Sequence, residues 1–164
     1  MTSFKVRGTI AQTVGELPKV GLPAPDFELT TAELEEVTKA SLSGRRVVLN
    51  IFPSVDTGVC AASVRRFNEL AADLADTTVL CVSMDLPFAL GRFCGAEGLE
   101  NVVVASAFRS SFGDDFGVTQ ANGPLAGLFA RAIVVLDEQG IVLHTQINED
   151  LHVEPDYSAA LASL

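Results

Sequence analysis

Short apolar runs separated by polar turns recur along the chain and predict a series of β-strands. Buried strands are expected at 47–52, 79–84 and 101–105, where most residues are apolar. Two further runs, 132–136 and 141–147, are separated by a short polar turn and predict a β-hairpin. The second half of the chain therefore ends in an antiparallel unit, whereas the strands before it alternate with helical patterns.

The N-terminal part of the chain shows a weaker pattern. Residues 4–14 alternate around Gly8, which predicts a small N-terminal β-hairpin. Phe27 and Leu29 indicate a short strand, and 33–40 is expected to be a polar surface element.

Helical spacing follows the predicted strand at 47–52. Beginning at Cys60, apolar residues occur at steps of 4, 3, 4 and 3, the pattern of one buried helix face; they are Val64, Phe67, Ala71 and Leu74. Further helices are expected from Pro87, over 108–116 and over 155–164. Strand–helix alternation with a terminal hairpin predicts an α/β fold with a central mixed β-sheet flanked by helices, in one domain over 1–164.

The segment 50–60 carries the most informative chemistry. Pro53 interrupts the apolar run, and Asp56 and Thr57 are residues that favour the start of a helix, so Cys60 falls within the first helical turn. Unpaired backbone N–H groups and the positive end of the helix dipole favour the thiolate form of a cysteine there. Because Cys60 also begins the apolar stripe, we expect a half-buried, reactive thiol.

Charge and hydropathy restrict the partners. The formal net charge is −10, so nucleic acid and anionic membranes are not expected partners, because both require a basic surface. No apolar stretch reaches the ~18 residues of a membrane-spanning helix, and the first residues lack the apolar segment of a signal peptide. We therefore expect a cytoplasmic protein.

The three cysteines do not form a recognisable scaffold. Cys60, Cys81 and Cys94 are separated by 21 and 13 residues, so there is no C-x-x-C pair, and neither a disulfide framework nor a metal site is expected. Cys81 lies inside an apolar run and is interpreted as inert core. His144 and His152 are interpreted as ordinary surface or hydrogen-bonded residues.

Three strings resemble one family. The spacing Pro53-x-x-x-Thr57-x-x-Cys60 resembles the active-site signature of peroxiredoxins. The longer strings 50–60, 88–98 and 127–137 are similar to the bacterial thiol peroxidases, which are atypical 2-Cys peroxiredoxins. The resemblance covers essentially the whole chain and implies a thioredoxin-like fold, an N-terminal β-hairpin and a homodimer.

The resemblance also implies a role for each matching residue. Cys60 would be the peroxidatic cysteine, which attacks a hydroperoxide, and Cys94 the resolving cysteine, which forms an intramolecular Cys60–Cys94 disulfide. Thioredoxin would reduce that disulfide, and no metal or other cofactor would be needed. Arg131 would supply positive charge and hold the peroxide, Thr57 would cap the helix and direct its hydroxyl at the sulfur or the peroxide, and Pro53 would wall the pocket.

Two further expectations concern the reaction cycle. We expect the two cysteines to lie too far apart to bond in the reduced fold, so that local unfolding is part of the cycle. Peroxide reduction would belong to antioxidant defence, and both hydrogen peroxide and alkyl hydroperoxides are expected substrates.

Simpler interpretations remain open at this stage. Cys94 could be core packing, Thr57 only a helix cap, Pro53 only a strand end and Arg131 a structural ion-pair partner. At the level of function, the alternative is a thioredoxin-fold redox sensor or binding module that signals through oxidation of Cys60. A thiol–disulfide oxidoreductase is a weaker alternative, because Cys60 lacks a C-x-x-C partner.

Overall fold

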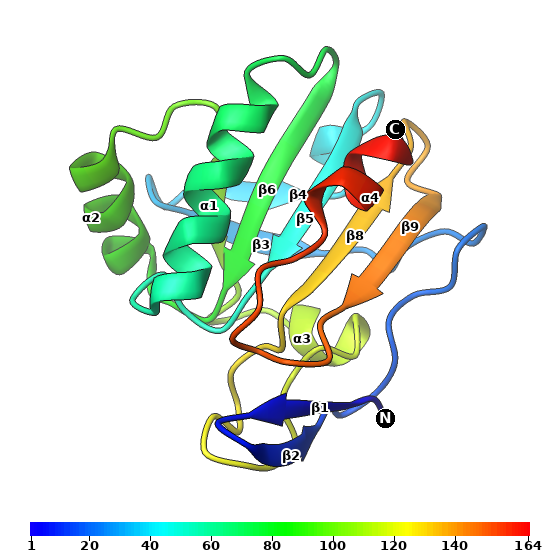
Figure 1. Cartoon of the computed structure of the whole chain (residues 1–164). Helices are drawn as coiled ribbons and strands as arrows, with labels where there is room; N and C mark the ends of the chain where they lie inside the picture. The colour runs from blue at the N-terminus through cyan, green and yellow to red at the C-terminus, as the bar shows by residue number, and fades with distance from the viewer.

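The computed structural model describes all residues, 1–164, and contains two β-sheets (Figure 1). The central sheet has seven strands in the order β4-β3-β7-β6-β5-β8-β9, and the second sheet is the two-stranded hairpin β1-β2. The strands are β1 Ser3–Val6, β2 Thr9–Gln12, β3 Glu28–Thr31, β4 Glu36–Thr38, β5 Arg46–Ile51, β6 Thr77–Ser83, β7 Val103–Ser106, β8 Ala132–Leu136 and β9 Val142–Ile147.

The central sheet is mixed, as predicted. β5, β6 and β7 run parallel to one another, whereas β3/β4, β3/β7, β5/β8 and β8/β9 are antiparallel pairs. The parallel strands require crossover helices, and α1 and α2 provide them. The helices are α1 Gly58–Ala71, α2 Pro87–Glu97, α3 Phe112–Asp115 and α4 Tyr157–Ala162, with a short 3₁₀ turn at Ala40–Leu42.

Helices cover both faces of the sheet because side chains alternate along each strand. In β5, Leu49 and Ile51 join the core that includes Phe112 and Phe116 from α3 and the residue after it. Val48 faces the other way, into a core formed with α1, α2 and α4 (Figure 1). Cys60 lies in this second core.

Most predicted elements are confirmed. The N-terminal hairpin, the strand at 47–52 with the helix after it, and the terminal hairpin are all present. The helix expected over 108–116 is wrong in length, since α3 contains only Phe112–Asp115. The backbone N–H of Phe112 is bound by the Ser110 hydroxyl, a local contact that competes with an earlier helical turn. The segment 33–40 contains the edge strand β4 in addition to polar turns.

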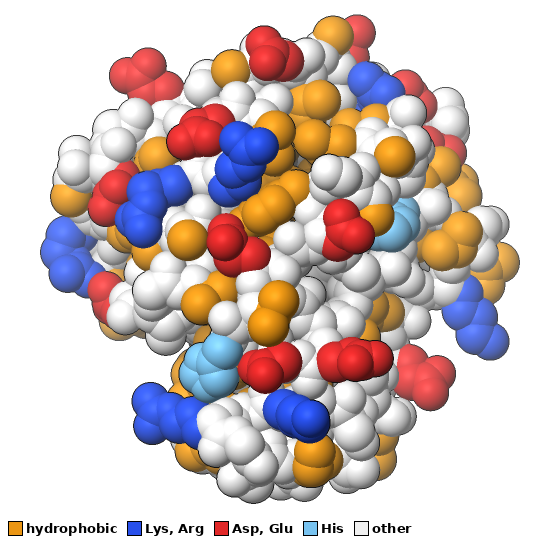
Figure 2. All heavy atoms as spheres, in the orientation of Figure 1, with side chains coloured by type: hydrophobic (Ala, Val, Ile, Leu, Met, Phe, Trp, Pro, Cys, Tyr) orange, Lys and Arg blue, Asp and Glu red, His pale blue; other side chains and the backbone are white.

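The strand ends that matter for function lie at one end of the sheet, where the central strands begin or terminate. β5 and β6 end there, α1 begins there, and the antiparallel strand β8 starts there. Figure 1 shows the β1-β2 hairpin beyond this same end of the sheet, and the segment between β9 and α4 passes along this end. None of the helices is long and apolar enough to cross a bilayer. On the face shown in Figure 2, acidic and basic side chains are interspersed.

Candidate active site

Pro53 and Thr57 lie in the turn that delivers Cys60 to the first turn of α1. Pro53 is buried, and Thr57 occupies the residue before the helix with an extended backbone. The Thr57 hydroxyl does not cap the helix: it donates to the Ser54 carbonyl at 3.1 Å instead. The predicted side-chain cap is therefore wrong, and no hydrogen bond joins Thr57 to the Cys60 sulfur in this conformation.

Cys60 is more deeply buried than expected. Its exposed fraction is 0%, so the expectation of a half-buried thiol is wrong. The stripe that begins at Cys60 continues through Val64 and Phe67, both also at 0%, and all three pack into the core beside β5 and β8. The apolar spacing identifies the face of the helix correctly, but the depth of the thiol depends on what covers the helix end.

Arg131 is the charged group beside the Cys60 sulfur. It immediately precedes β8, is 2% exposed, and its Nη2 lies 3.3 Å from Cys60 Sγ. The Leu151 carbonyl accepts hydrogen bonds from Arg131 Nε at 3.1 Å and from Nη2 at 3.0 Å. The third nitrogen, Nη1, is buried without a partner. Leaving a buried donor without a hydrogen bond is costly, so an acceptor atom of a bound ligand would be stabilised at Nη1.

Asp85 organises the turn before α1. Its carboxylate accepts hydrogen bonds from the Ser54 hydroxyl at 2.7 Å, the Val55 N–H at 2.9 Å and the Ser83 hydroxyl at 2.7 Å. Asp85 follows β6, and the turn follows β5, so the parallel pairing of these strands brings them together. Sequence reasoning missed this residue, and its only sequence signal was a carboxylate directly after a buried strand.

Cys94 lies on α2 and is half-buried. It lines a groove of about 510 Å³ that also includes Glu33 and Glu100. Burial, with a smaller contribution from the negative charge of Glu33, raises the pKa of the Cys94 thiol. Cys94 packs against the same core that contains Cys60, and all three cysteines are free thiols.

Cys81 is separated from this chemistry. It is 0% exposed in β6, and burial raises the pKa of its thiol to about 12. The Asn50 side chain donates to Cys81 Sγ at 3.6 Å and to the Ser63 hydroxyl at 3.3 Å, while that hydroxyl donates to the Cys60 carbonyl. Cys81 therefore remains protonated at neutral pH, consistent with a core role.

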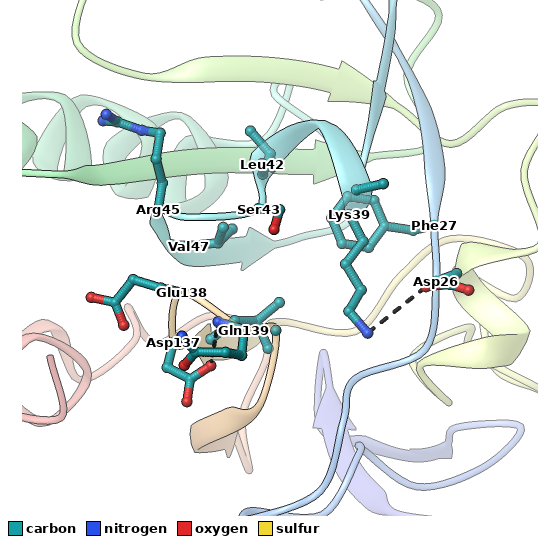
Figure 3. Close-up of a pocket in the computed structure, with 13 residues that line it drawn as sticks. Asp26, Phe27, Lys39, Leu42, Ser43, Arg45, Val47, Asp137, Glu138 and Gln139 are labelled. Carbon is teal, nitrogen blue, oxygen red and sulfur yellow. Dashed lines mark hydrogen bonds and ion pairs between the residues drawn. The ribbon is translucent and has the colours of Figure 1, made fainter.

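A small polar cavity lies away from the cysteines. A cavity of about 130 Å³ opens at the opposite end of the sheet, where β5 begins and β8 ends (Figure 3). In Figure 3 the Lys39 ammonium reaches toward Asp26, at 3.8 Å, and it also donates to the Ala24 carbonyl. No group of three or more His, Cys, Asp or Glu side chains is arranged to hold a metal ion.

Cys60 lies in the first turn of a helix that follows a strand of the central sheet, and a buried arginine contacts its sulfur. A cysteine in this position on this fold defines the class of thioredoxin-fold proteins that act through a cysteine. Residues 19–161 match the Redoxin family model. The chain is 57% identical over 164 residues to the thiol peroxidase of Corynebacterium glutamicum and 58% identical to that of Mycobacterium tuberculosis, covering 100% of this chain and 99% of each relative. The chain therefore belongs to the Redoxin family and, within it, to the bacterial thiol peroxidases.

The structural comparison agrees. A peroxiredoxin-like protein from Aquifex aeolicus superposes with a TM-score of 0.93 at 35% identity, covering 98% of this chain and 94% of that chain. A thiol peroxidase from Chromobacterium violaceum shares the fold with a TM-score of 0.90 at 20% identity, with the same coverage. The thioredoxin-like fold and the peroxiredoxin class predicted from the sequence are thus confirmed.

Proposed function

We propose that the protein reduces hydrogen peroxide and alkyl hydroperoxides through Cys60. The Cys60 thiolate attacks one oxygen of the O–O bond, an S–O bond forms as the O–O bond breaks, and the other oxygen leaves as water or alcohol after taking up a proton. The observation that carries this proposal is the 3.3 Å contact between Arg131 Nη2 and Cys60 Sγ, beside the unpartnered Nη1.

Arg131 is suited to both ends of this step. Nη2 stabilises the sulfur anion, while Nη1 is free to donate to a peroxide oxygen and to stabilise the negative charge that develops on the leaving oxygen. We assign peroxide binding to Arg131 together with Thr57 and Pro53, which both lie in the turn before α1. Because Cys60 is fully buried, entry of the peroxide requires the surrounding segments to move.

Cys94 is proposed to complete the cycle. Its thiol attacks the Cys60 sulfenic acid, which releases water and forms a Cys60–Cys94 disulfide, and the dithiol of thioredoxin then reduces it. The helix that carries Cys94 contains Gly91 and Gly95, each costing about 1 kcal/mol relative to alanine. Its link to the turn before α1 is an exposed Arg92–Asp56 ion pair, which contributes little. Both features favour the local unfolding that the disulfide needs.

We also propose that the protein is a homodimer that works in the cytoplasm as a single domain over 1–164. Large exposed apolar side chains gather where β6 and β7 end: Leu86 is 53% exposed, Phe88 71% and Phe108 40%. The Ser106 hydroxyl joins the two loops, since it donates to the Asp85 carbonyl and accepts from the Phe108 N–H. A self-complementary contact between two copies would bury this patch.

Sedimentation should show Phe88→Ser shifted toward monomer and the control Val20→Ser unchanged; a dimer unaffected by Phe88→Ser would contradict this interface.

The peroxidase proposal is tested by stopped-flow consumption of hydrogen peroxide with and without thioredoxin. Cys60→Ser should abolish consumption, whereas Cys94→Ser should consume one peroxide per chain and then fail to recycle. Slow, stoichiometric oxidation of the unmodified protein without turnover would instead identify a redox sensor.

A further inference from the structure

We infer that the N-terminal hairpin positions Arg131 for the reaction by holding the segment that carries the Leu151 carbonyl. This inference rests on the proposed function, because it concerns the same thiol and the same arginine. It assigns a role to β1, an element that lies outside residues 19–161 matched by the family model.

The first link joins Arg131 to the segment between β9 and α4. The Leu151 carbonyl accepts from Nε and from Nη2, and Nη2 is also the nitrogen that contacts Cys60 Sγ. Two hydrogen bonds to one acceptor fix the plane of the guanidinium, so a displacement of the carbonyl displaces the nitrogen next to the sulfur. No carboxylate hydrogen-bonds or pairs with Arg131, which leaves this backbone oxygen as its anchor.

The second link joins that segment to the hairpin. The Lys5 N–H donates to the Glu149 carbonyl at 2.7 Å, and the Leu151 N–H donates to the Lys5 carbonyl at 3.0 Å, so the segment pairs with β1 as a short parallel bridge at Asp150. Apolar contacts support the pairing, since the side chains of Phe4, Val6 and Leu151 share one buried cluster. Ala130, the residue before Arg131, belongs to the same cluster.

Through these two links the hairpin is connected to Arg131, by way of the segment that carries Leu151. In Figure 1 the β9–α4 segment lies between the hairpin and the end of the sheet where α1 begins. The hairpin forms no ladder with the central sheet. Its first strand, β1, bonds to this segment, whereas Gln12 of β2 and the nearby Val14 bond to residues 119–122. Detaching β1 should therefore release Leu151 and allow the guanidinium to turn away from Cys60.

The test compares two proline substitutions in the same hairpin. Lys5→Pro removes the N–H that binds Glu149. Ile10→Pro is the matched control: Ile10 stands opposite Lys5, and because the Lys5 backbone groups face Glu149 and Leu151, this pair is not hydrogen-bonded across the hairpin. The second-order rate of Cys60 oxidation by hydrogen peroxide should fall about tenfold in Lys5→Pro and stay unchanged in Ile10→Pro.

A pH profile separates positioning from loss of fold. In Lys5→Pro the pH midpoint of the peroxide reaction should move upward, because the sulfur anion loses its cationic neighbour. Tyr157, whose pKa burial raises, remains neutral, and the ionisable neighbours Glu149, Asp150 and His152 are kept in both variants. If Lys5→Pro does not fold, Val6→Ala, which thins the packing on Leu151, should give a smaller shift in the same direction.

The outcomes are distinguishable. A normal rate and midpoint in folded Lys5→Pro, or equal losses in Ile10→Pro, would overturn the positioning role while leaving the peroxidase intact. Absence of Cys60-dependent turnover in the unmodified protein would instead overturn the proposed function.

Discussion

A buried arginine without a carboxylate partner is an expensive residue. Desolvating a charge costs several kcal/mol unless hydrogen bonds or an opposite charge offset it, and Arg131 has one backbone carbonyl and one sulfur as partners. The resemblance to the thiol peroxidases assigned Arg131 to the Cys60 sulfur, whereas the residues alone left its partner open. The structure identifies Cys60 Sγ as that partner, and an anionic sulfur is the form that best offsets the cost.

The first prediction concerns the shape of this cation. Arg131→Lys keeps the charge but has a single nitrogen, which cannot bind the Leu151 carbonyl, the sulfur and a peroxide oxygen together. We expect the rate of Cys60 oxidation to fall by about two orders of magnitude, with a similar or larger loss in Arg131→Ala. Stopped-flow measurement of the reduced protein checks this, and a lysine variant that reacts at the normal rate would contradict the two-point role.

The second prediction concerns pH and the resolving thiol. Burial and the charge of Glu33 raise the pKa of Cys94, so its thiol is protonated at neutral pH and disulfide formation should accelerate as pH rises. Glu33→Gln removes a charge that opposes the thiolate, so it should lower that pKa and speed disulfide formation at neutral pH. Glu100→Gln, in the same groove, is the control. Quenched-flow sampling measures the rate of disulfide formation in both variants over a range of pH. Identical pH profiles for the two variants would exclude the effect of Glu33.

At the scale of elements, the strand–turn–helix unit around 47–60 could be read from the sequence because its signals are local. Proline, helix-start residues and the apolar stripe all lie within a short stretch. Asp85 and the Leu151 carbonyl could not be found in this way. Asp85 reaches the turn only through the pairing of β5 with β6, and a backbone carbonyl has no residue-specific signature.

The third prediction tests how Asp85 holds the turn. Asp85→Asn replaces charged acceptors of three hydrogen bonds with one neutral oxygen and an NH₂ group that cannot accept. We expect a loss of about 1–3 kcal/mol in the free energy of unfolding and slower oxidation of Cys60. Denaturant titration and stopped-flow measure the two effects.

Asp73→Asn, at an exposed position after α1, is the matched control and should change neither quantity. A variant at position 85 that loses stability but reacts with peroxide at the normal rate would make Asp85 structural only.

At the scale of the whole molecule, the two cores on either side of the sheet carry the stability, and one of them contains the thiols of Cys60 and Cys81. Cys81 lies in the core that packs under α1, and its folded-state pKa of about 12 exceeds the ordinary value of 9.0. The apolar run around Cys81 predicted this burial, whereas the strand order β4-β3-β7 at the sheet edge had no local signal.

The fourth prediction is an alkaline loss of stability. Because the folded-state pKa of Cys81 is raised, the thiol ionises first in the unfolded chain, so its contribution is intact below pH 9 and is lost as pH rises toward 12. The loss should be about 1.4 kcal/mol per pH unit in that window. Cys81→Ala should be less stable at neutral pH but show a shallower decline, measured by denaturant titration; parallel curves would contradict the assignment.

The most direct test of the account is mass spectrometry of the reduced protein after one equivalent of hydrogen peroxide, with the linked sulfurs mapped by peptide. The account predicts a Cys60–Cys94 disulfide, with Cys81 unmodified, and a sulfenic acid on Cys60 alone in Cys94→Ser. Initial oxidation at Cys94, or a linkage through Cys81, would contradict it.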